Sequence, residues 1–182
     1  MAEHLDSQKI FNNIPFHCTY LSNIDITTEL HDHDFYEFFL VTESSIIHLV
    51  NNEIQELNNN SLIFIRPEDT HYFQKIENQK CHFINLAFTR NIFNRLVNFI
   101  DNEKLKKLLN SNLPPSAKIT SEKKENIKKR IDRINTISQS KKEIKTIQYQ
   151  TLLLEFTSEY FLTEYKDQEN LPEWLNKIYK KM

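Results

Sequence analysis

The spacing of apolar residues changes near residue 90. Up to Phe88, short apolar runs alternate with turn residues, which is typical of the strands of a β-sandwich or barrel. After Thr89, apolar residues recur every three to four positions, which predicts amphipathic helices. The predicted strands are 11–20, 24–30, 35–42, 46–50, 53–57, 61–67 and 81–88, and 68–75 is predicted to start as a loop and end as a strand. The chain is therefore expected to have a β-rich first half and a helical second half.

Three helices are predicted in the second half. The first runs from Ile92 to Leu109 and bends around Asp101-Asn102, and the second begins at Thr120, whose hydroxyl suits an N-cap. The third follows residues 138–140 and extends to about residue 165. Its apolar stripe has the spacing of one helix face and consists of Tyr149, Leu152, Leu153, Phe156 and Tyr160.

The composition indicates one ordinary globular core. The chain has 182 residues, 39% of them hydrophobic, and a net charge of −2. Glycine is absent, so turns that need positive φ must use the next most tolerant residue, asparagine. Asn51-Asn52 is accordingly predicted to form a type I′ hairpin turn, and residues 58–60 the next turn.

Several classes of protein are disfavoured. No apolar run reaches the ~18 residues of a membrane span, and the first ten residues lack the apolar core of a signal peptide, so a cytoplasmic location and no membrane partner are expected. Cys18 and Cys81 have no CxxC spacing and are expected to be buried reduced thiols. The lysine-rich stretch 118–145 contains interspersed acidic residues, which is typical of a solvated helix face.

The stretch HDHDFYEFFLV at 31–41 carries the most distinctive chemistry. If it is one strand, the side chains of His31, His33 and Glu37 lie on one face together with Phe35 and Phe39. Asp32 and Asp34 then point the other way. A few polar groups on an apolar wall are what a small-molecule pocket or a metal site requires.

A second segment, PEDTH at 67–71, adds His71 about 35 residues later. Three imidazoles and one carboxylate suit Zn, Fe, Mn or Ni. The remaining strand histidines, His17, His48 and His82, are expected to be core or surface residues.

The pairing of HxHxxxE with a later proline-then-histidine segment resembles the two motifs of the cupin superfamily. This resemblance implies a small double-stranded β-helix of the jelly-roll type. It also implies a divalent metal held by His31, His33, Glu37 and His71, although no cofactor is required, since many related sensors bind their ligand without a metal.

The whole layout resembles the N-terminal sensor domain of AraC-type transcription regulators. HDHDFYEFFLV is similar to their H-x-H-x-F-Y-E strand, and LNNNSLIFIRP at 57–67 is similar to their second hairpin, with asparagine in place of glycine. FYEFFLV and IRPEDTH further resemble regulators of chitobiose and β-glucoside utilisation. LPEWLNKI at 171–178 resembles the entry to the family's DNA-binding domain.

The resemblance implies a division into a ligand-binding barrel at 1–90, a helical dimerisation segment at 91–168, and the start of a missing DNA-binding domain at 169–182. A small molecule, expected to be a sugar, would bind in the barrel and act through an N-terminal arm at 1–16 or through the helices. Polar contacts would come from His31, His33, Glu37 and His71, and apolar contacts from Phe35, Phe39 and Phe73. The homodimer would form through Leu152, Leu153, Phe156 and Tyr160.

Alternatives remain open at this point. The same residues suit a small cupin metalloenzyme of the dioxygenase or isomerase type, although the long C-terminal helices disfavour an enzyme. A purely structural dimerisation domain with a vestigial pocket is a third interpretation. The stripe on the last helix is equally consistent with packing against the barrel.

Overall fold

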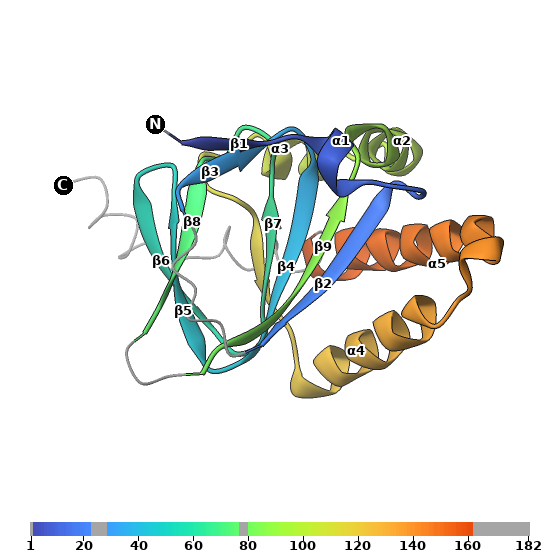
Figure 1. Cartoon of the computed structure of the whole chain (residues 1–182). Helices are drawn as coiled ribbons and strands as arrows, with labels where there is room; N and C mark the ends of the chain where they lie inside the picture. The colour runs from blue at the N-terminus through green and yellow to red at the C-terminus, as the bar shows by residue number, and fades with distance from the viewer. Residues whose placement is uncertain (1, 23–28, 77–79, 162–182) are drawn as a thin grey trace.

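The computed structural model describes residues 2–22, 29–76 and 80–161. They form two five-stranded sheets and a group of helices (Figure 1). The strands are β1 (Glu3–Leu5), β2 (Phe16–Ser22), β3 (His31–His33), β4 (Tyr36–Glu43), β5 (Ser45–Val50), β6 (Glu53–Asn58), β7 (Ser61–Ile65), β8 (His71–Lys75), β9 (His82–Phe88) and β10 (Ser116–Lys118). The helices are α1 (Ser7–Ile10), α2 (Arg90–Ile100), α3 (Glu103–Leu109), α4 (Ser121–Asn135), a 3₁₀ turn (Gln139–Lys141), α5 (Lys142–Glu155) and a π-helical end (Phe156–Phe161).

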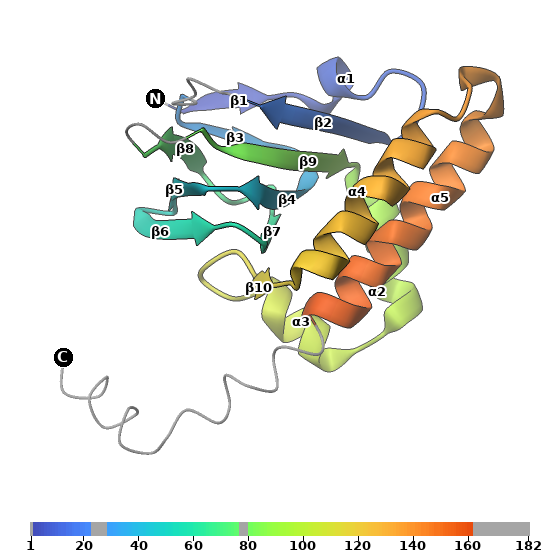
Figure 2. The ribbon, with the colours of Figure 1, turned by 90° about the horizontal axis from the view of Figure 1, so that it is seen from below.

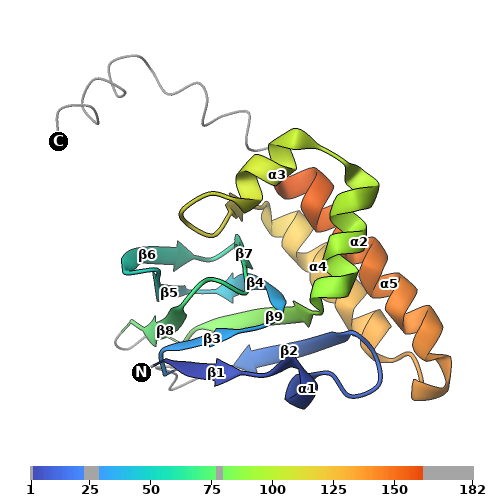
Figure 3. The same cartoon turned by 90° about the horizontal axis from the view of Figure 1, so that it is seen from above.

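The molecule has three layers. The first sheet has the order β1-β3-β8-β5-β6, and the second has the order β10-β7-β4-β9-β2. One apolar core fills the space between the sheets, and another lies between the second sheet and the helices. Helices α4 and α5 lie side by side beyond the second sheet (Figures 2 and 3). The β-rich barrel followed by helices, predicted from the apolar spacing, is confirmed.

Strand β4 lies at the centre of the second sheet and is buried on both faces. Phe38 and Leu40 belong to the core under the helices, whereas Phe39 and Val41 belong to the core between the sheets. Because side chains alternate along a strand, β4 contacts both cores with alternate residues.

The turns use asparagine as predicted. Asn51 and Asn52 join β5 to β6 with φ of 50° and 68°, which is the sign that a type I′ turn needs, and Asn60 has φ of 71° between β6 and β7. Asp101 is left-handed between α2 and α3, and the Asn102 side chain caps α3. The predicted bend at Asp101-Asn102 is confirmed.

Two strand predictions are wrong. The stretch 31–41 is not one strand, because β3 ends at His33 and the chain crosses to the other sheet before β4 begins at Tyr36. The strand predicted to begin at Phe11 begins at Phe16, since the preceding residues form α1 and the segment that follows it. Most of the strand predicted at 24–30 lies outside the described residues.

The helical half also contributes to the barrel. Strand β10, which follows Pro115, pairs antiparallel with β7 at the edge of the second sheet. The residues after 90 therefore supply one strand of the barrel as well as the helices that cover it. None of the helices in the described ranges has the run of apolar residues that a bilayer crossing requires.

The predicted dimer contacts on α5 need correction. Leu152, Leu153 and Phe156 are at most 2% exposed in the single chain, because they pack in the core between the second sheet and the helices. They are internal residues and cannot form a surface contact. The side chain of Tyr160 and residues 169–182 lie outside the described part. The exposed apolar residues of α5 are Ile144 and Ile147.

Candidate functional site

Three predicted site residues meet between the two sheets. The candidate ligand atoms of His33, Glu37 and His71 all lie within 4.8 Å of one another. Each comes from a different strand: His33 ends β3, Glu37 lies in β4, and His71 begins β8. All three side chains are buried, at 1%, 6% and 0% exposure. We refer to these three residues as the histidine cluster.

Hydrogen bonds orient the cluster. Nδ1 of His33 lies 2.8 Å from the Phe35 carbonyl oxygen, which only accepts, so this nitrogen carries the proton and donates. Nε2 of His33 then faces Glu37 at 3.4 Å from Oε2, and Asn85 donates to Oε1 of Glu37 at 2.8 Å. On the other side, Nδ1 of His71 lies 3.4 Å from Nε2 of His48. Within the described residues, Nε2 of His33 and Nε2 of His71 are buried without a hydrogen bond.

Glu37 is an anion in this site. Its burial favours the neutral acid, but His33, together with His71 and Asn85, outweighs that effect and lowers the pKa of Glu37 to about 2. Conversely, burial opposes protonation of His33, yet the neighbouring Glu37 carboxylate raises the pKa of His33 above its ordinary value. Without a ligand, the pair is therefore a buried ion pair.

The other two buried imidazoles are neutral. Burial lowers the pKa of His71 well below its usual value, and the neighbouring imidazoles act in the same direction. Burial likewise lowers the pKa of His48 to about 4. Both rings therefore keep a lone pair at neutral pH, as a hydrogen-bond acceptor or a metal ligand requires.

Aromatic rings flank the cluster, and they include the three that the sequence predicted. The ring of Phe35 stacks on His33 with centroids 4.4 Å apart. Phe39 stacks on Phe73 at 4.1 Å, and Phe73 stacks on His48 at 4.6 Å. The polar groups thus lie on an apolar wall built from both sheets.

His31 lies beside the cluster and is not one of its three members. Its ring centroid is 4.4 Å from that of His71, whereas its Nδ1 is directed to the Glu29 carbonyl oxygen at 2.8 Å. Asp32 pairs with His4, and Asp34 accepts hydrogen bonds from the backbone N–H and hydroxyl of Ser7. Both aspartates therefore point away from the cluster, toward the N-terminal segment.

Sequence reasoning missed two contributors, His48 and Asn85. His48 is fully buried and was expected to be only an ordinary strand histidine. Its position between Ile46 and Val50, both buried, is the signal that could have placed it inward. Asn85 is a polar residue in the middle of the apolar strand β9, which is unusual unless the side chain has a partner.

The cluster fits a divalent metal. Two buried imidazole nitrogens converge with one ionised carboxylate: Nε2 of His33 faces Glu37, and Nε2 of His71 has no hydrogen bond in the described part of the chain. This is the donor set that Zn, Fe, Mn and Ni accept. The bond from Nδ1 of His33 to a backbone carbonyl is the kind of outer contact that orients a ligating histidine. The same groups can equally donate and accept hydrogen bonds with an organic ligand.

Comparisons with known proteins identify the family and the fold. A family model described as AraC-like ligand binding domain matches residues 13–156. The structure of apo ToxT K231A from Vibrio cholerae superposes with a TM-score of 0.58 at 10% identity, covering 82% of this chain and 59% of that one. ToxT from Vibrio cholerae O395 bound to (E)-4-(8-methylnaphthalen-1-yl)but-3-enoic acid gives a TM-score of 0.50 at 12% identity, covering 81% and 59%. The chain thus spans 59% of the length of these structures.

A weaker likeness is to a cupin 2 conserved barrel domain protein from Salinispora arenicola, with a TM-score of 0.40 at 12% identity, covering 46% of this chain and 71% of that one. None of the curated proteins matches the sequence.

Proposed function

Because the chain belongs to the AraC-like ligand-binding domain family, we propose that it senses a small-molecule effector between its two sheets and controls an attached DNA-binding domain. The observation that carries the proposal is the histidine cluster, a buried set of polar groups in which Nε2 of His71 has no hydrogen-bond partner among the described residues. Leaving such a group unpaired is costly, and a bound effector would satisfy it. The site is thus arranged to gain stability from a ligand.

A sugar or sugar derivative is the effector class that we propose. Glu37 and His71 would accept hydrogen bonds from hydroxyl groups, and Phe35, which stacks on His33, is part of the apolar wall beside them. The likeness of FYEFFLV to regulators of chitobiose and β-glucoside utilisation supports the same class.

We propose that β3 transmits a conformational change from the site to the N-terminal segment. The His33 side chain belongs to the histidine cluster, whereas the neighbouring Asp32 side chain pairs with His4 of the N-terminal segment. Strand β1 of that segment also pairs parallel with β3. An effector can shift a conformational equilibrium only if it binds two arrangements with different affinity. We propose that the effector changes the position of β3 and thereby the docking of the N-terminal segment.

A divalent metal in the histidine cluster is part of the proposal. His33, Glu37 and His71 would hold it, and when bound it would supply open coordination positions for an effector oxygen. His33 must lose its proton to bind the ion, so the affinity should fall as the pH is lowered. Metal analysis of protein dialysed against Zn²⁺, Ni²⁺ or Mn²⁺ tests this, with His71→Gln expected to lose the ion and the surface variant His82→Gln to keep it. No stoichiometric metal in the wild type would refute the metal site.

A second candidate, a small cupin metalloenzyme, is favoured by the same donor set of two imidazoles and one carboxylate. The two candidates differ in the fate of the bound molecule. A sensor releases its effector unchanged, whereas an enzyme converts it. Mass spectrometry of a stabilising compound after prolonged incubation with metal-loaded protein distinguishes them, and a new product that requires Glu37 would support the enzyme.

Homodimerisation is also proposed. Since Leu152, Leu153 and Phe156 are internal, the contact would use the exposed residues Ile144 and Ile147 of α5. Sedimentation should reveal a dimer that Ile147→Asp weakens. A strict monomer at high concentration would exclude this interface.

The effector proposal is tested by a thermal-shift screen against sugars, sugar phosphates and metals. A compound that binds only the folded state raises the unfolding temperature. The stabilisation should disappear in His71→Gln and persist in His82→Gln, since His82 lies at the surface beside Glu43. A compound that stabilises wild type and His71→Gln equally would exclude the histidine cluster as its site.

A further inference from the structure

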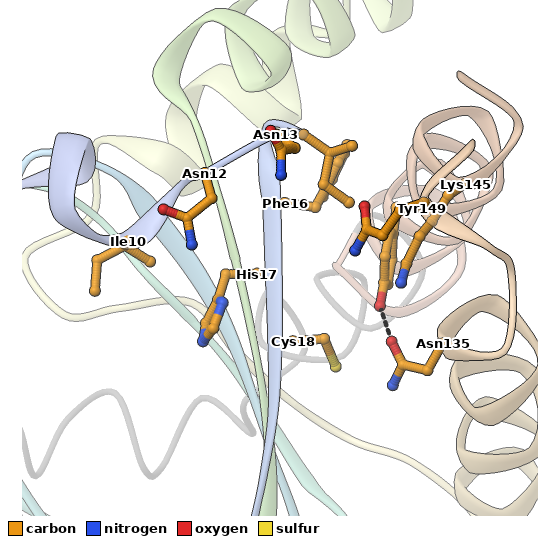
Figure 4. Close-up of a pocket in the computed structure, with 11 residues that line it drawn as sticks. Ile10, Asn12, Asn13, Phe16, His17, Cys18, Asn135, Lys145 and Tyr149 are labelled. Atoms are coloured by element: carbon orange, nitrogen blue, oxygen red, sulfur yellow. Dashed lines mark hydrogen bonds between the residues drawn. The ribbon is translucent and has the colours of Figure 1, made fainter. Parts of the chain in front are cut away.

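A cavity of about 230 Å³ lies where the N-terminal segment meets the hairpin of α4 and α5 (Figure 4). One wall is formed by residues 10–18, and the other by side chains from the end of α4, the 3₁₀ turn and α5. A volume of 230 Å³ equals that of roughly eight water molecules and is smaller than a typical drug-sized pocket. It therefore suits a small metabolite.

This cavity is separate from the histidine cluster. Phe16 and Cys18 of β2 pack against the core under the helices, which is on the helix side of the second sheet. The residues of the histidine cluster lie on the opposite side, between the two sheets. The second sheet therefore stands between the two sites.

The lining has a cation and many hydrogen-bond donors, and it includes no carboxylate. Lys145 is half-buried, and within the described residues its ammonium has no ion-pair partner. Side-chain amides of Asn12, Asn13 and Gln139 line the same cavity. The amide oxygen of Asn135 accepts a 2.6 Å hydrogen bond from the Tyr149 hydroxyl (Figure 4). A lysine among amide N–H groups is an environment that stabilises an anion.

The other titratable groups near the cavity add no negative charge to its lining. The nearby Asp132 carboxylate accepts a 2.7 Å hydrogen bond from the Tyr20 hydroxyl and is not part of the lining. Burial raises the pKa of Cys18 to about 12, so this thiol adds no negative charge. His17 lines the cavity as well and is exposed.

We propose that this cavity binds a small metabolite through an oxyanion, a carboxylate or a phosphate, that pairs with Lys145 and accepts hydrogen bonds from the surrounding amides. The site is a second ligand site, independent of the effector proposed for the histidine cluster. A ligand there contacts both residues 10–18 and the α4–α5 hairpin, so it joins the N-terminal segment to the helices.

The test is an NMR titration of the whole chain with inorganic phosphate and, separately, with acetate, at constant ionic strength. Saturable shifts are expected at the side-chain amides of Asn12, Asn13 and Gln139. They should vanish in Lys145→Gln and persist in the matched variant Lys142→Gln, which removes a lysine of the same helix outside the cavity. The two anions distinguish a phosphate site from a carboxylate site. Shifts that do not saturate, or that survive Lys145→Gln, overturn the proposal.

Discussion

A single carboxylate favours the charged form of the buried imidazole that faces it. Glu37 stays ionised despite its burial because His33 faces it and Asn85 donates to its other oxygen. Burial opposes protonation of His33, and Glu37 is the main group that nevertheless raises the pKa of His33 above its ordinary value. The charges of Glu37 and His33 are therefore coupled, and replacing Glu37 should lower the pKa of His33.

Glu37→Gln should lower the pKa of His33, which lies above its ordinary value in the wild type. Burial disfavours the imidazolium, and without the Glu37 carboxylate only the Phe35 carbonyl and the Asp69 carboxylate oppose that effect. Titration of the His33 ring nitrogens by NMR measures the change. Glu43→Gln, which removes a surface carboxylate beside His82, is the control and should leave the His33 titration unchanged. A His33 pKa unaffected by Glu37→Gln would contradict the ion pair.

The metal-free protein should lose stability as the pH falls from about 6.5 toward 4. His48 has a pKa of about 4 when folded and 6.5 as a free residue, so in this window only the unfolded chain binds its proton. The full effect of His48 is about 3 kcal/mol, and His71 acts in the same sense. His33 acts in the opposite sense, because its pKa is raised in the folded protein. Its contribution to stability is present at low pH and is lost as the pH rises.

Urea unfolding in EDTA at several pH values measures this dependence. His48→Gln removes one of the two destabilising imidazoles and should make the decline shallower. A slope equal to that of wild type would show that His48 is not buried in its neutral form.

At the scale of elements, α5 is a helix whose two faces have different roles. Tyr149, Leu152 and Leu153 are at most 1% exposed, whereas Ile144 and Ile147 on the same helix are at least half exposed. The inward face holds α5 against the second sheet and α4. The outward face is exposed in the single chain and is the face proposed to contact a second copy. Truncating inward and outward residues should therefore have different effects on stability.

Leu153→Ala should lower the free energy of unfolding by about 2–5 kcal/mol, because it leaves a cavity in a packed core. Ile147→Ala at low protein concentration should change it by no more than about 0.5 kcal/mol. Chemical denaturation measures both. Similar losses for the two variants would contradict the orientation of α5.

Features that depend on local interactions were predicted from the sequence better than features that depend on distant contacts. Asn51-Asn52 and Thr120 act locally, through backbone φ and a cap bond from Lys123 N–H to the Thr120 hydroxyl, so short patterns were enough. The break between β3 and β4 depends on the chain crossing between sheets, which no local pattern encodes. His33 and Glu37 were found because the alternation of side chains continues across that break, and His71 was found from the separate PEDTH segment. His48 and Asn85 were missed because their partners are distant in sequence.

At the scale of the whole molecule, the loop between β7 and β8 connects the barrel to the helices. Arg66 is buried and donates to the carbonyl oxygens of Leu109 and Ser111 at 2.8 and 2.5 Å, at the end of α3. Asp69 binds the same guanidinium at 2.7 Å and also accepts from Asn51. This ion pair lies two residues before His71 and links the site strand to α3.

Asp69→Asn should therefore destabilise the protein strongly, by about 3–5 kcal/mol, because it leaves the buried Arg66 guanidinium without its counter-charge. Glu68→Gln is the matched control: Glu68 is 62% exposed and 3.7 Å from Arg66, so its loss should cost less than about 1 kcal/mol. Calorimetry of both variants measures the difference. Equal effects would mean that the internal pair contributes no more than the surface pair.

The burial of β4 on both faces has a mechanical consequence. A strand with one face in water can absorb a displacement by letting solvated side chains rearrange, but β4 has little such compliance between Glu37 and Val41. Packed interiors are stiff and transmit strain. Any movement that a ligand imposes on Glu37 must therefore appear as a displacement of Phe38 and Leu40, and through them of the helices behind the sheet.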